Sequence, residues 1–120
     1  MKTVMVSGSL NWDLVDVINS KLLEEWDGPM CLIQGMARGA DSIARSYALN
    51  RGWQIRDFPP NYVSFGRTAT HIRNQEMVNC KPDVALFFIR DFSNGTMTTL
   101  EKAVKARLKV RPFYYDDYAL

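Results

Sequence analysis

Two patterns of hydrophobic and polar residues recur along the chain: short apolar runs typical of strands, and longer segments whose apolar residues are spaced as on one face of a helix. Thr3 to Val6 is a short β-rich run, and the segment from Asp13 to Trp26 repeats its apolar residues at helical intervals. A second apolar run covers Met30 to Gln34, and Ala40 to Arg51 again places apolar residues on one face of a helix. The first half of the chain therefore predicts strand, helix, strand, helix.

The second half continues this alternation. Trp53 to Phe58 indicates a third strand, and Asp83 to Ile89 a fourth that is apolar throughout, as expected where helices cover both faces of a sheet. Thr96 to Arg107 predicts a helix and Lys109 to Phe113 a fifth strand. Strands that alternate with helices pair in parallel through right-handed crossovers. We therefore expect an α/β fold, an open doubly wound sheet of about five strands.

One connection does not fit this pattern. Pro59 to His71 is a long segment before a short helix predicted from Ile72 to Asn79. Long loops without secondary structure are uncommon in compact domains and often cover or bind ligands. An unrecognised turn of helix is the alternative.

Composition narrows the class of protein. A chain of 120 residues with 47% hydrophobic and 23% charged residues is typical of one globular domain, so we expect a single domain over 1–120. A net charge of +2 leaves the partner open. Cys31 and Cys80 lack the neighbours that a zinc site needs, and we expect no metal. No apolar run reaches bilayer length and the N-terminus resembles no secretory signal, which favours a cytoplasmic protein without membrane contact.

Three glycine-containing turns follow predicted strands. They are Ser7-Gly8-Ser9, Gly35 to Asp41, and Asn94-Gly95-Thr96. Each precedes or opens a helix, whose free N–H groups and dipole favour an anion. In a sheet ordered 3-2-1-4-5, strands 2, 1 and 4 are neighbours, so the turns would share one crevice at the carboxyl edge. For any turn alone, strand ending and helix capping are sufficient explanations.

Taken together, five segments resemble the YspA-like branch of the SLOG superfamily: Val6 to Ser9, Gly35 to Ala44, Phe65-Gly66-Arg67, Ile72 to Met77 and Asn94-Gly95-Thr96. This superfamily groups the DNA-processing protein DprA with the Lonely Guy phosphoribohydrolases. The resemblance implies a Rossmann-like fold and a nucleotide-type ligand, including NAD or ADP-ribose derivatives, with no cofactor required. It also favours a homodimer.

The chain departs from the family pattern at its turns. Leu10 replaces the arginine of the usual Gly-Ser-Arg, so the positive contact would be missing or supplied by Arg38, Arg67 or Arg73. Met36 stands where a second glycine is common.

The Lonely Guy resemblance concerns His71, Arg73 and Met77, which align with a stretch whose arginine is catalytic. Those enzymes pair the arginine with a glutamate shortly after Gly-Thr. Here the first glutamate is Glu101, displaced by about one helical turn, or roughly 5 Å. Glu76 and Asp41 are the other candidate carboxylates.

Three hypotheses follow. The favoured one is a binding or sensing module, with Trp12, Tyr62 or Phe65 stacking on a base, although Trp12 and Tyr62 are equally suited to packing. The second is an N-glycosidic phosphoribohydrolase acting on nucleoside monophosphates through Arg73 and Glu76. The third is single-stranded DNA binding by the basic residues between Lys102 and Arg111. The predicted ligand-binding residues are Ser7, Gly8, Ser9, Trp12, Gly35, Arg38, Gly39, Asp41, Arg67, Arg73, Asn74, Asn94, Gly95 and Thr96.

Overall fold

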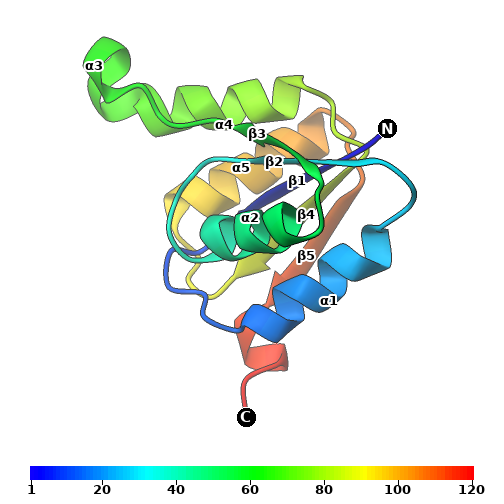
Figure 1. Cartoon of the computed structure of the whole chain (residues 1–120). Helices are drawn as coiled ribbons and strands as arrows, with labels where there is room; N and C mark the ends of the chain where they lie inside the picture. Colours follow the sequence, from blue (N-terminus) through cyan, green and yellow to red (C-terminus); the bar gives the residue numbers. More distant parts are fainter.

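The computed structural model describes residues 1–120 and contains one parallel sheet (Figure 1). Its five strands lie in the order β3-β2-β1-β4-β5, which confirms the predicted topology. The strand bounds are β1 Lys2–Gly8, β2 Met30–Gln34, β3 Gln54–Asp57, β4 Val84–Ile89 and β5 Val110–Tyr114. The main helices are α1 Val15–Glu25, α2 Ala40–Asn50, α4 Ala69–Asn79 and α5 Asn94–Lys105.

The two faces of the sheet are covered by different helices, as a doubly wound fold requires. Side chains of α1 and α2 pack with Val84, Leu86 and Phe88 in one core cluster. Side chains of α4 and α5 pack with Ala85, Phe87 and Ile89 in the other. Alternate residues of β4 therefore point to opposite faces, and all six are buried. Burying each large apolar side chain contributes about 1.5–3 kcal/mol.

The segment from 59 to 71 contains helical structure, the alternative left open for it. Asn61 caps the short helix α3 Tyr62–Phe65, since its Oδ1 accepts a hydrogen bond from the Ser64 N–H at 3.1 Å. A 3-10 turn, η1 Gly66–Thr68, leads into α4, which begins three residues before the predicted start at Ile72. Figure 1 shows α3 at the end of an arm that stands away from the sheet.

Several predicted boundaries were wrong by a few residues. Strand β1 continues to Gly8, because its pairing with β4 runs on to Phe88. Helix α1 begins at Val15 instead of Asp13. Helix α5 begins at Asn94 because Ser93, and not a later residue, supplies the N-cap. A further 3-10 turn, η2 Tyr115–Asp117, follows β5, and no helix in the chain is long and apolar enough to cross a membrane.

Candidate functional site

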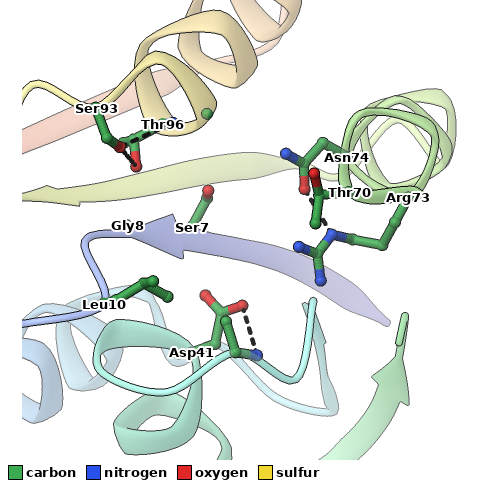
Figure 2. Close-up of a pocket in the computed structure, with 11 residues that line it drawn as sticks. Ser7, Gly8, Leu10, Asp41, Thr70, Arg73, Asn74, Ser93 and Thr96 are labelled. Carbon is green, nitrogen blue, oxygen red and sulfur yellow. Dashed lines mark hydrogen bonds between the residues drawn. The ribbon is translucent and has the colours of Figure 1, made fainter. Parts of the chain in front are cut away.

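A cavity of about 200 Å³ opens at the carboxyl edge of the sheet, where the three turns meet helix α4 (Figure 2). The first turn contributes Ser7, Gly8 and Leu10. The second contributes Ala37 and Asp41, and the β4–α5 turn contributes Ser93, Gly95 and Thr96. The remaining lining residues are Thr70, Arg73 and Asn74 on α4. The central strands thus bring together the turns that the sequence placed at one edge.

Two glycines allow the turns to approach this closely. A Cβ on Gly8 would lie 2.3 Å from the carbonyl oxygen of Phe88. One on Gly39 would lie 2.5 Å from the carbonyl oxygen of Ser9, and Gly39 has a φ of +75°, which disfavours other residues. Any larger residue would separate β1 from β4 or from the start of α2. These glycines therefore shape the cavity, and Gly39 does so without lining it.

Ser9 and Trp12 hold the first turn in place and do not face the cavity. The Ser9 hydroxyl accepts hydrogen bonds from the N–H groups of Arg90 and Asp91, at 2.8 and 3.1 Å. Trp12 is 2% exposed, and its ring meets Phe88 and Tyr115 edge-on. The expected stacking of Trp12 on a ligand is therefore corrected to a packing role, because core side chains occupy the surroundings of its ring.

Arg73 is the principal cation of the cavity. Its side chain extends from α4, and the residue is 9% exposed (Figure 2). Nε donates to Oδ1 of Asn74 at 2.7 Å, and Nη1 donates to the carbonyl oxygens of Gly35 and Phe58. Arg73 forms no salt bridge, and Nη2 has no acceptor within the chain. Burial lowers the pKa of Arg73, with Asp41 and Tyr62 opposing it, yet a guanidinium stays charged at neutral pH.

Asp41 is the only carboxylate lining the cavity, and it is 6% exposed. Its Oδ2 accepts hydrogen bonds from the N–H groups of Gly35 and Ala37, at 3.1 and 3.3 Å. Burial raises the pKa of Asp41 to about 6, against the lowering effects of the Ala37 N–H, the Arg73 charge and the Gly35 N–H. The loop contacts use one oxygen, and Oδ1 has no donor in the chain.

The start of α5 forms another wall. The Ser93 hydroxyl accepts the Thr96 N–H at 3.4 Å and also contacts the Thr96 hydroxyl at 3.2 Å. The N–H groups of Asn94 and Gly95 have no acceptor in the chain. Such groups carry the positive end of the helix dipole. The wall therefore offers hydrogen-bond donors to the same cavity that Arg73 lines.

Several predicted residues lie outside the cavity. Arg38 lines an adjoining hollow that shares Leu10 and Ser93 with the cavity, and Arg67 is exposed in η1. Of the three arginines considered as replacements at Leu10, the cavity therefore holds Arg73. The side chain of Asn94 and the backbone of Gly35 do not line it, although the Gly35 carbonyl oxygen holds Arg73.

Of the three carboxylates proposed for a hydrolase, Asp41 lines the cavity and the two glutamates lie elsewhere. Glu76 is exposed and lines a small depression beside α3, together with Phe65. Glu101 is exposed on α5 and does not line the cavity. Tyr62 is 60% exposed on the arm and does not line it either.

The basic residues near the C-terminus are partly engaged within the chain. Lys102 donates to the carbonyl oxygen of His71 at 3.3 Å, and Arg111 pairs with Glu24 and Glu25. The two glutamates offset the charge of Arg111, whereas Lys102 keeps its charge.

Sequence reasoning missed Thr70 and Ser93 as lining residues. Thr70 precedes Arg73 and Asn74 by three and four residues, the spacing of one helix face, but the predicted helix began after it. Ser93 is the N-cap of α5, and a serine directly before a segment with helical spacing of apolar residues is a recognisable signal for such a cap.

Comparison with known proteins identifies the family. Residues 2–65 match the YAcAr family, described as the YspA, cpYpsA-related SLOG family. The chain is 31% identical over 121 residues to the Gene 61 protein of Mycobacterium phage D29, covering 94% of this chain and 97% of that protein. Its fold is similar to that of DNA processing protein A (DprA) from Streptococcus pneumoniae, with a TM-score of 0.77 and 15% identity. That match covers 93% of this chain and 50% of the DprA chain, so this chain spans half the length of DprA. The chain belongs to the YspA, cpYpsA-related SLOG family.

Proposed function

We propose that the cavity binds a phosphate-bearing ligand of the nucleotide type. The observation that carries this proposal is Arg73, a buried cation that faces the cavity without a carboxylate partner. The Asp41 carboxylate attracts Arg73 but forms no salt bridge with it, so an anion in the cavity would offset part of the cost of burying this charge. The three groups that hold Nε and Nη1 also fix the direction of the guanidinium before a ligand arrives.

The start of α5 adds donors suited to the same anion. The N–H groups of Asn94 and Gly95 are free, and Gly95 lines the cavity. Hydrogen bonds to charged groups each contribute about 1.5–3 kcal/mol, and a helix N-terminus adds about 0.3–1 kcal/mol. A phosphate between Arg73 and α5 would therefore receive several charge-assisted bonds. Membership of the SLOG family supports a role connected with nucleotides or DNA.

The experiment is a thermal unfolding screen of the full chain with inorganic phosphate, AMP, ADP-ribose and NAD. A ligand that binds only the folded state at 100 times its Kd stabilises that state by about 2.7 kcal/mol. We expect at least one phosphorylated compound to raise the Tm, and Arg73→Gln to abolish the increase. Arg67→Gln removes the same charge from an exposed site outside the cavity and should leave the increase intact.

Arg73 also donates to two carbonyl oxygens, so its replacement should lower the Tm even without ligand. The ligand-induced increase in Tm is therefore measured for each variant against the same variant without ligand. If no phosphorylated compound raises the Tm of the natural chain, the proposal fails. An equal increase in the Arg73→Gln variant would place the anion elsewhere.

N-glycosidic hydrolysis ranks second, because neither candidate glutamate lines the cavity and the third candidate carboxylate, Asp41, is held by two loop N–H groups. Release of free base from a nucleoside monophosphate, lost in Arg73→Gln, would promote it to first place. Single-stranded DNA binding ranks third, and its test is salt-sensitive binding that weakens on charge reversal at Lys102 and Lys105.

A further inference from the structure

A second hollow, the α1–α2 groove, lies on the sheet face that α4 and α5 do not cover. It has a volume of about 330 Å³ and shares no lining residue with the cavity at the carboxyl edge. Figure 1 shows α1 and α2 running in the same direction along this face. The groove is therefore separate from the phosphate site. Its lining includes Val15 and Asn19 of α1, and Ile43, Ser46, Tyr47 and Arg51 of α2 and its C-cap.

Asn19 carries an oxygen without a partner. Its Oδ1 is one of two buried side-chain polar atoms in the chain that have no hydrogen-bond partner, the other being Trp53 Nε1. Buried polar atoms are almost always paired, because an unpaired one loses its hydration without compensation. The Asn19 amide can turn about χ2, a broad torsion, so a ligand N–H in the groove can supply the missing donor. Because an amide both donates and accepts, a peptide bond is its natural complement.

The cation of the groove is Arg51, which ends α2. Its guanidinium lies over the Tyr47 ring, 4.0 Å from the centroid, and forms no salt bridge. A carboxylate complements this charge and can accept two parallel hydrogen bonds from the planar guanidinium. The dipole at the C-terminus of α2 opposes a doubly charged phosphate more strongly than a singly charged carboxylate. Arg51 therefore favours a carboxylate ligand.

The spacing of these groups sets the length of the ligand. Val15 and Ile43 lie near the starts of the two helices and give the groove an apolar end, where Val15 is 47% exposed. Ile43 and Arg51 are eight residues apart on α2, or roughly 12 Å along its axis. An extended peptide rises roughly 3.3 Å per residue. The groove therefore matches about three to four extended residues.

We infer that the α1–α2 groove binds a short extended peptide segment that carries a carboxylate. The carboxylate pairs with Arg51, a peptide bond pairs with the Asn19 amide, and an apolar side chain packs on Val15 and Ile43. This inference goes beyond the proposed function and does not depend on it, since the two sites share no residue. The carboxylate belongs to a C-terminus or to an acidic side chain, and the experiment distinguishes the two.

The test is a ¹H–¹⁵N NMR titration of the full chain with three peptides of equal length. Acetyl-Leu-Ala-Ala-Ala has a C-terminal carboxylate, acetyl-Leu-Ala-Ala-Asp amide has a side-chain carboxylate, and acetyl-Leu-Ala-Ala-Ala amide is neutral. We expect at least one acid to bind about tenfold more tightly than the neutral peptide, the effect of one charge-assisted hydrogen bond. Saturable shifts should include the Asn19 side-chain amide and Arg51 Nε–H. The tighter acid identifies the source of the carboxylate.

Three variants test the named contacts. Arg51→Gln should bring the tighter acid to within about threefold of the neutral peptide, as expected for a neutral hydrogen bond. Arg67→Gln removes an exposed arginine outside the groove and should keep the tenfold preference. Asn19→Leu should weaken all the peptides by roughly threefold to tenfold without lowering the Tm, because it removes an unpaired buried oxygen.

Equal binding of the acids and the neutral peptide to the natural chain would overturn the inference. A tenfold preference that survives Arg51→Gln, or an unchanged affinity in Asn19→Leu, would also overturn it. Shifts confined to Asn94 and Gly95 would place the carboxylate in the cavity, which contradicts the groove as the site. No binding at millimolar peptide would overturn the inference and leave phosphate binding in place. The three peptides compared on the natural chain remain decisive even if a variant does not fold.

Discussion

Replacing Asp41 with Asn should change how the stability of the unliganded protein depends on pH. Burial raises the pKa of this carboxyl from 3.8 to about 6, so between these values the folded state binds more protons than the unfolded state. The favourable contribution of Asp41 to the free energy of unfolding is therefore complete below about pH 4 and is lost as the pH rises through about 6. A difference of roughly two pKa units corresponds to about 3 kcal/mol at neutral pH.

Asn keeps an oxygen for the Gly35 and Ala37 N–H groups but does not ionise in this range. The free energy of unfolding of Asp41→Asn, minus that of the natural chain, should therefore grow by about 3 kcal/mol from pH 4 to pH 7. Urea unfolding at several pH values measures both, and the subtraction cancels the other titrating groups. Arg73, which faces Asp41 across the cavity, stays charged throughout.

Asp57→Asn provides a control of opposite sign. Arg45 forms a salt bridge with Asp57 at 2.9 Å and holds the pKa of that carboxyl below its usual value. The natural chain should therefore gain stability over Asp57→Asn as the pH rises from acid values. A difference for Asp41→Asn that is independent of pH, or that shrinks toward neutral pH, would refute the burial of a charged Asp41.

Four further substitutions, one of them a control, test how the turns are built. Gly8→Ala would place a Cβ 2.3 Å from the Phe88 carbonyl oxygen and should lower the free energy of unfolding by about 1–3 kcal/mol or more. As the control, Gly95→Ala places a Cβ that meets no atom within 4 Å and should be tolerated. Equal effects of the two substitutions in urea unfolding would contradict the close approach of Gly8 to Phe88. Trp12→Ala should cost about 3–5 kcal/mol of stability and leave the ligand affinity of the folded protein unchanged. A loss of affinity without a loss of stability would show that Trp12 contacts the ligand. Ser9→Ala leaves two backbone N–H groups without their acceptor and should cost about 1–3 kcal/mol in thermal unfolding, a change within error being the contrary result.

The sheet was predictable because its strands carry strong local signals. Met30–Gln34 and Val84–Ile89 are buried along their whole length, and a strand covered on both faces is apolar throughout. Once the strand order is known, the turns after β1, β2 and β4 must meet at one edge. The position of the cavity follows from topology more than from any single motif.

The directions of individual side chains depended on contacts far apart in sequence. Trp12 lies near the first turn, but its ring packs in the core against Phe88 and against Tyr115, which follows the last strand. Arg38 lies within the second turn but lines the adjoining hollow and not the cavity itself. Thr70 was missed because the start of α4 depends on the preceding 3-10 turn, which has no strong sequence signal.

The central claim is that an anion binds between Arg73 and the start of α5. Its most direct measurement is a ¹H–¹⁵N NMR titration of the full chain with ribose 5-phosphate. We expect saturable shifts of the Asn94 and Gly95 backbone amides and of the Arg73 side-chain N–H signals, while Gly28 and Gly52, at the opposite ends of α1 and α2, remain unchanged. Shifts confined to other regions, or no shift at millimolar ligand, would contradict the account.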